Sequence, residues 1–137
     1  MPVCASGPKT EVGDGHIDVL ARLSRGGKKL RVYDIKAPEA DVRHALGQAV
    51  AYVAALKFVL TQEGGAVEQW WRLIGFRAKP RRMSAFEAFA LVADTPRNRS
   101  AVEAIIDRLS CSNKEGITPD AMYYHRTPSG RLEIRAR

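Results

Sequence analysis

The fold is decided by the stretch from residue 16 to residue 36, which reads HIDVLARLSRGGKKLRVYDIK. Its first part, 16–23, is rich in apolar and β-branched residues, and its last part, 29–36, alternates polar with apolar residues, a pattern typical of half-buried strands. Between them lies a turn sequence that contains Gly26 and Gly27. We therefore expect the two segments to pair as a β-hairpin.

The sequence after this hairpin predicts a long helix. Pro38 has no amide hydrogen to offer a strand ladder and ends the second strand. Asp41 is a suitable residue to cap a helix N-terminus. From there to residue 60, apolar side chains recur at spacings of three and four, which predicts a helix over 41–60 with one apolar face.

The rest of the chain continues this alternation. Ser100 is followed three residues later by Glu103, the spacing of a capping box, and predicts the start of a helix. Residues 127–130, Thr-Pro-Ser-Gly, are a turn signal between two short strands. The further expected elements are a helix at 67–74, a strand at 86–93 for which a helix stays open, a helix at 100–109, and strands at 122–125 and 132–135.

Length and composition indicate one domain over 1–137, with 1–10 as a flexible leader. A chain of 137 residues, 45% of them apolar, buries enough surface to fold without disulfide or metal staples. Cys4 and Cys111 form no metal or disulfide pattern. The apolar run 49–60 is interrupted by Lys57 and is shorter than the roughly 18 apolar residues of a membrane span. With no secretory signal in 1–10, a cytoplasmic protein is expected.

The charge favours polyanionic partners. The chain has 22 Lys and Arg against 15 Asp and Glu, a net charge of +7. Trp70 and Trp71 precede a cluster of basic residues, a composition that can hold phosphates and stack on unpaired bases. Adjacent tryptophans on a helix face different ways, so at least one is expected in the core. The basic cluster consists of Arg72, Arg77, Lys79, Arg81 and Arg82, and Lys28, Lys29 and Arg31 of the hairpin can extend it.

Three charged residues of the hairpin make a candidate metal site. Asp34 and Lys36 are two apart on one strand and project from the same face. Pairing across the turn brings Asp18 beside Asp34. Two adjacent carboxylates repel each other unless a cation lies between them, and oxygen ligands suit Mg²⁺ or Mn²⁺. A metal there can polarise a phosphodiester, while Lys36 orients water or stabilises charge on the phosphate.

These residues, with two more on the following helix, resemble a known family. The motifs GHID at 15–18, DIK at 34–36, and Gln48 and Tyr52 at helical spacing follow in the order of the PD-(D/E)xK nucleases, the restriction-endonuclease-like superfamily, in its RecB-type and related branches. The resemblance covers residues 11–56. It implies an α/β fold with a restriction-endonuclease-like core, in which a mixed central sheet is flanked by helices.

The resemblance also implies roles for single residues. Asp18, Asp34 and the carbonyl of Ile35 would hold Mg²⁺ or Mn²⁺. Lys36 would be the catalytic lysine, and Gln48 and Tyr52 would steady the lysine and the substrate. The expected activity is metal-dependent hydrolysis of DNA, with RNA left open as a substrate. Recognition in such nucleases is often supplied by dimerisation or by a partner subunit.

One departure from the family pattern leaves two questions open. Many members carry a further acidic residue or a histidine on a helix ahead of the first strand, for which this chain has no room. Glu11, Asp14 or His16 can supply that ligand, or it is absent. The alternative function is therefore a catalytically inactive module that binds nucleic acid or scaffolds a larger complex. A second alternative is a domain that docks an acidic protein through Trp70, Trp71 and the arginines.

Overall fold

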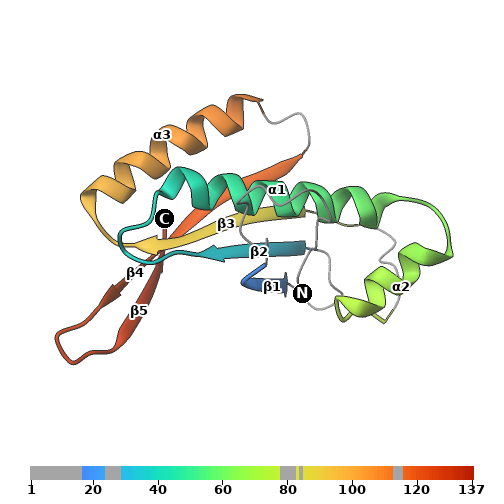
Figure 1. Ribbon diagram of the computed structural model, residues 1–137, viewed down its shortest axis with the longest axis horizontal. Helices are drawn as coiled ribbons and strands as arrows, with labels where there is room; N and C mark the ends of the chain where they lie inside the picture. The colour runs from blue at the N-terminus through green and yellow to red at the C-terminus, as the bar shows by residue number, and fades with distance from the viewer. Residues whose placement is uncertain (1–16, 24–28, 78–82, 84, 113–115) are drawn as a thin grey trace, which may run out of the picture.

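The computed structural model describes residues 17–23, 29–77, 83, 85–112 and 116–137, with the backbone alone at 22–23 and 110–112. The described residues form five strands and three helices (Figure 1). Their order is the one that the sequence predicts. In chain order they are β1 (Val19–Leu23), β2 (Lys29–Ile35), α1 (Val42–Thr61), α2 (Gly65–Leu73), β3 (Ala85–Ala93), α3 (Pro96–Ser112), β4 (Ile117–Arg126) and β5 (Leu132–Ala136).

The strands form one mixed sheet in the order β1-β2-β3-β4-β5. β1 pairs with β2 in antiparallel orientation, which confirms the expected hairpin, and β4 pairs with β5 in the same way. β2, β3 and β4 are parallel neighbours. Parallel pairing requires a crossover, which α1 and α2 supply between β2 and β3 and α3 supplies between β3 and β4. The mixed α/β class is thus confirmed.

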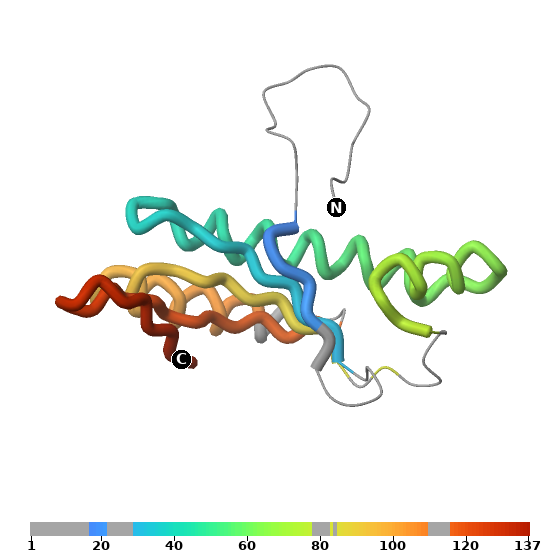
Figure 2. Tube along the Cα trace, turned by 90° about the horizontal axis from the view of Figure 1, so that it is seen from below, coloured from blue at the N-terminus to red at the C-terminus, as the bar shows by residue number. Residues whose placement is uncertain are grey.

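α1 and α3 cover one face of the sheet (Figures 1 and 2), and Figure 1 shows α2 beyond the end of the strands, next to the C-terminal end of α1. Alternate residues of β2, starting at Leu30, are buried on this face and face Phe86 and its alternate neighbours in β3. One core cluster lies between the sheet, α1 and α2 and includes Leu56 and Trp71. A second lies between the sheet, α1 and α3 and includes Val102.

The apolar segment at 86–93 forms a strand, and the helical alternative is wrong. β3 is the central strand, hydrogen-bonded to β2 on one side and to β4 on the other. Eight of its nine residues are buried, because the helices cover one face and neighbouring side chains shield the other. Such two-sided burial removes the alternation that marks a half-buried strand.

Capping explains where α1 and α3 begin. The Asp41 carboxylate accepts a hydrogen bond from the Arg43 amide, so the predicted start of α1 is confirmed. The prediction that Ser100 caps α3 is wrong, because the helix begins at Pro96. The Thr95 hydroxyl accepts a 3.1 Å hydrogen bond from the Asn98 amide. Pro96 suits the first helical position, where no amide hydrogen is needed.

α1 is longer than the apolar run that the sequence analysis singled out. Over Val42–Thr61, α1 is the one helix among the described residues that is long and apolar enough to cross a membrane. Length and composition alone are weak evidence of a span, because a core helix of a soluble protein meets the same criteria. Seven residues of α1 are buried, and they contribute to both core clusters. Burial of this face against the sheet accounts for part of the apolar composition of α1.

Candidate active site

The hairpin brings Asp18 to the end of β2. In the described β1–β2 ladder the last pair is Val19 and Tyr33. Asp18, one residue before Val19, and Asp34, one residue after Tyr33, are therefore the next two residues opposite each other. The Ile35 amide donates a 2.6 Å hydrogen bond to Asp18 Oδ2. By strand alternation, Asp18 and Asp34 share the face that α1 covers. The structure therefore places these two predicted residues together.

Asp34 is a buried carboxylate. Its residue is only 3% exposed. Burial raises the pKa of the Asp34 carboxyl, Lys36 lowers it, Asp18 raises it further, and His44 lowers it. Lys36 Nζ lies 3.1 Å from Asp34 Oδ2 as an ion pair, yet this oxygen has no well-directed hydrogen-bond partner among the described residues. A buried carboxylate oxygen in this state is suited to accept a cation.

Lys36 is held at several points. Its ammonium donates a 2.7 Å hydrogen bond to Gln48 Oε1 on α1, so the structure brings this predicted pair together. Its amide donates to the Leu91 carbonyl of β3, and its carbonyl accepts a 2.8 Å hydrogen bond from the Tyr124 hydroxyl of β4. Three elements thus fix Lys36 just beyond the end of β2.

The carbonyl of Ile35 points to the side of Asp18. The described peptide bonds are all trans, so the carbonyl of one residue and the amide of the next point in opposite directions. The Lys36 amide points at β3. The Ile35 carbonyl therefore points away from β3, toward the side on which the Ile35 amide meets Asp18. Asp18 and the Ile35 carbonyl thus lie on the same side of the end of β2.

Tyr52 follows Gln48 by one helical turn. Its ring is half-buried and packs against the core cluster between the sheet, α1 and α2. His44 lies one turn before Gln48 on the exposed surface of α1 and acts electrostatically on Asp34. The side of α1 that faces the strand end thus carries His44, Gln48 and Tyr52 at four-residue spacing.

The donor set fits a hard divalent cation in kind but is incomplete in number. Two carboxylates and a carbonyl are the oxygen ligands that Mg²⁺ and Mn²⁺ prefer. Among the described residues, however, no three His, Cys, Asp or Glu side chains form a group that could hold a metal ion. The three candidates for a further ligand, Glu11, Asp14 and His16, lie outside the described residues.

The aromatic and basic segment divides between core and surface. Trp71 is 1% exposed and makes an edge-to-face contact with Phe76, with ring centroids 4.8 Å apart. Trp71 belongs to the core cluster between the sheet, α1 and α2, and Trp70 is half-buried against that cluster. The expectation that at least one tryptophan lies in the core is therefore confirmed. Arg72 and Arg77 are exposed. Lys79, Arg81 and Arg82 lie outside the described residues.

The basic residues of the hairpin lie far from this site. Lys29 begins β2, and the seven residues to Lys36 span about 23 Å at about 3.3 Å per residue. Lys29 and Arg31 both pair with Glu87, at 3.3 Å and 2.6 Å, so this carboxylate offsets part of their charge. Burial raises the pKa of the Glu87 carboxyl, but Arg31 and Lys29 lower it by more, so the net shift of this pKa is downward. Lys28 lies outside the described residues.

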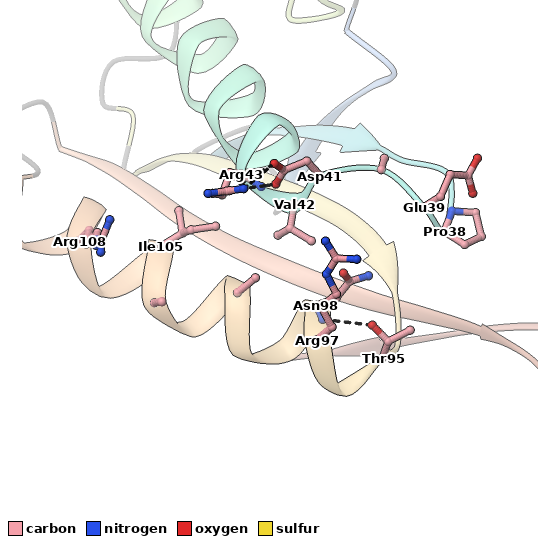
Figure 3. A pocket seen from close by; sticks show the side chains of 13 residues that line it. Pro38, Glu39, Asp41, Val42, Arg43, Thr95, Arg97, Asn98, Ile105 and Arg108 are labelled. Atoms are coloured by element: carbon pink, nitrogen blue, oxygen red, sulfur yellow. Dashed lines mark hydrogen bonds and ion pairs between the residues drawn. The ribbon is translucent and has the colours of Figure 1, made fainter.

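A separate cavity of about 530 Å³ lies between the start of α1 and the side of α3 from Arg97 to Arg108 (Figure 3). Arg43, Arg97 and Arg108 line it together with Glu39 and Asp41. Asp41 pairs with Arg43 at 3.1 Å, so the acidic and basic groups of this cavity partly neutralise each other. It contains none of the residues that the sequence predicts for the active site.

Sequence reasoning missed Tyr124. This residue lies 88 positions after Lys36 in the chain, and its hydroxyl holds the Lys36 carbonyl. Only the pairing of β3 with β4 brings it there. A tyrosine in a short strand carries no local signal of such a contact.

Comparison of the whole chain with protein-family models, with curated proteins and with solved structures gives no match.

Proposed function

We propose that this protein is a metal-dependent nuclease that hydrolyses phosphodiester bonds of DNA. The observation that carries the proposal is the cluster at the end of β2, where Asp18, the buried Asp34 and the Gln48-held Lys36 meet. The motif order along the chain and the net charge of +7 support the same function. In this proposal the protein has the restriction-endonuclease-like core that the motifs resemble.

In this proposal, different residues bind the metal, assist the hydrolysis and attract the nucleic acid. Asp18, Asp34 and the Ile35 carbonyl would hold Mg²⁺ or Mn²⁺. When bound, such an ion supplies Lewis-acid polarisation of the phosphate and lowers the pKa of a coordinated water. Lys36 donates a hydrogen bond to the attacked phosphate or to the incoming water, and Gln48 keeps its ammonium in place. Exposed Arg72 and Arg77 attract the nucleic acid.

The test compares matched variants of the purified chain. Labelled linear, single-stranded and branched DNA are incubated with Mg²⁺, Mn²⁺ or EDTA. We expect cleavage that requires metal and that is lost in Asp34→Ala and Lys36→Ala. The control variants Asp107→Ala and Lys57→Ala remove the same side chains from α3 and from the far half of α1, and they should cut normally. Equal activity in Asp34→Ala and Asp107→Ala would overturn the proposal.

One observation favours a second candidate function. In the described part of the chain, Asp18 and Asp34 have no third metal-binding side chain beside them. A module that binds nucleic acid without cutting it needs no complete metal site. Such a module would bind DNA with salt-sensitive affinity in the same assay and show no turnover with either metal.

A further inference from the structure

An apolar cleft adjoins the candidate active site. A cavity of about 430 Å³ is lined by Asp18 and by the apolar residues Ile17, Leu20, Leu56, Leu73 and Ile74. This volume is within the range of small-molecule sites, which is about 300–1,000 Å³. Among the described residues that line it, Asp18 is the charged one. A candidate metal ligand therefore forms one part of the wall and aliphatic side chains form the rest.

Three elements build the cleft, and each is fixed by the core. Leu56 is buried on α1, one turn after Tyr52, so the side of α1 that carries Gln48 continues to the cleft. α2 ends at Leu73, where the Ile74 amide still bonds to the Trp70 carbonyl. Gly75 turns the chain with a φ of 86°, a conformation that glycine adopts readily. Phe76 then packs on Trp71, which holds the end of α2 in place.

Leu73, one of the residues that line the cleft, is an exposed apolar side chain. Leu73 is 70% exposed although it is large and apolar. Arg72 and Arg77, both exposed, precede and follow the lining segment Leu73-Ile74-Gly75 in the sequence. An apolar cleft with exposed cations close by in the chain suits a ligand that has a flat apolar part and a negative charge next to it. A nucleotide has this combination.

We propose that this cleft receives an unpaired nucleobase of the strand whose phosphate lies at Asp18 and Asp34. The proposal rests on the proposed nuclease function and names its substrate class: DNA that is single-stranded, or unpaired at a branch, next to the cut. A base inside a duplex is stacked and paired, so it reaches such a cleft only after leaving the helix. Ile17, Leu20 and Leu73 contact the faces of the base, and Arg72 and Arg77 pair with the neighbouring phosphates.

The experiment measures binding in EDTA, so that cleavage plays no part in it. The probe is a single-stranded oligonucleotide of about twelve nucleotides that carries one fluorescent 2-aminopurine, beside a blunt duplex of the same sequence. Leu73→Glu is compared with Phe58→Glu. Phe58 is 68% exposed on α1. It lies two residues after Leu56, about 200° around the helix, so it faces away from the cleft. The two variants make the same change of charge.

We expect Leu73→Glu to weaken binding of the single strand by about tenfold and to abolish the change in 2-aminopurine fluorescence. Phe58→Glu should change the affinity less than about twofold, and Leu73→Glu should weaken binding of the duplex less than binding of the single strand. Equal losses of single-strand binding in the two variants would overturn the proposal. Leu73→Ala removes most of the side chain without introducing a charge, and it should also weaken binding of the single strand if the Leu73 side chain contacts the base.

This result is independent of the test of the nuclease. Should the base enter the cleft while no metal supports cleavage, the proposed nuclease function fails and the base-binding site stands. Should the chain cut DNA with metal while Leu73→Glu and Phe58→Glu bind single strands alike, the nuclease stands and the base-binding site fails.

Discussion

Asp34 is the residue at which stability and the proposed function conflict. Its carboxyl is buried, and its pKa is raised chiefly by that burial. The native state therefore holds the Asp34 proton to higher pH than the unfolded state does. The group favours the native state below its unfolded pKa, and this contribution is lost as the pH rises through the raised native pKa.

Asp34→Asn should accordingly raise the melting temperature of the metal-free protein at neutral pH. The gain should shrink as the pH is lowered through the raised pKa of Asp34, because the wild-type carboxyl then becomes neutral as well. Thermal denaturation in EDTA across this pH range measures it. Asp94→Asn is the control with the opposite sign, because hydrogen bonds from Arg99 lower the pKa of Asp94. A melting temperature of Asp34→Asn below that of the wild type at neutral pH would contradict this account.

Gln48 acts through Lys36, and we expect it to be a positioning residue. Gln48→Leu removes the 2.7 Å hydrogen bond to the ammonium. Loss of such a supporting contact typically costs about 10–100-fold in activity, and kcat should fall while DNA affinity stays unchanged. Gln48→Glu keeps an oxygen acceptor and should restore part of the rate. Gln69→Leu, on the exposed surface of α2, should behave like the wild type, and an equal loss in both leucine variants would exclude the positioning role.

At the scale of elements, the N-terminus of α3 can be tested by substituting the two candidate cap residues, Thr95 and Ser100. Thr95→Ala removes the hydroxyl that accepts from the Asn98 amide and should lower the free energy of unfolding by about 1 kcal/mol. Ser100→Ala lies inside the helix, where it should change stability by less than about 0.5 kcal/mol. Urea denaturation of the two variants decides between the start at Pro96 and the start that the Ser100 and Glu103 pattern favours. A larger loss at Ser100 would support the later start.

The capping-box pattern failed at this helix for a physical reason. Ser100 and Glu103 satisfy the spacing, but Thr95 and Pro96 form a start signal one turn earlier, directly after the end of β3. A helix begins at the earliest position where its first amides find acceptors and the chain leaves the sheet. Ser100 then continues a helix that has already formed.

At the scale of the whole molecule, the net charge of +7 should make binding of DNA sensitive to salt. The double variant Arg72→Gln, Arg77→Gln should weaken DNA binding and reduce the slope of log K against log salt by about 1 to 2. Titrations at several salt concentrations measure it. The double variant Arg126→Gln, Arg131→Gln removes two charges at the β4–β5 hairpin, which Figure 1 places at the opposite end of the molecule from α2. Equal slopes in the two double variants would exclude a specific role for α2.

The sequence by itself determined the order of the elements, the hairpin and the start of α1. These features depend on local signals: alternation in 29–36, the N-cap Asp41 and a helical repeat of apolar residues up to Leu60. The approach of Asp18 to Asp34 was also predictable, because a hairpin defines which residues face each other across a short turn.

Only the tertiary structure decided what surrounds these residues. The burial of Asp34 requires α1 to lie over β2. The hydrogen bond from Tyr124 to Lys36 requires β4 to be placed next to β3, and the cleft beside Asp18 requires the end of α2 to pack near β1. Each of these depends on contacts between segments far apart in the chain. Local propensities do not encode such contacts, because they arise only when the whole core is buried at once.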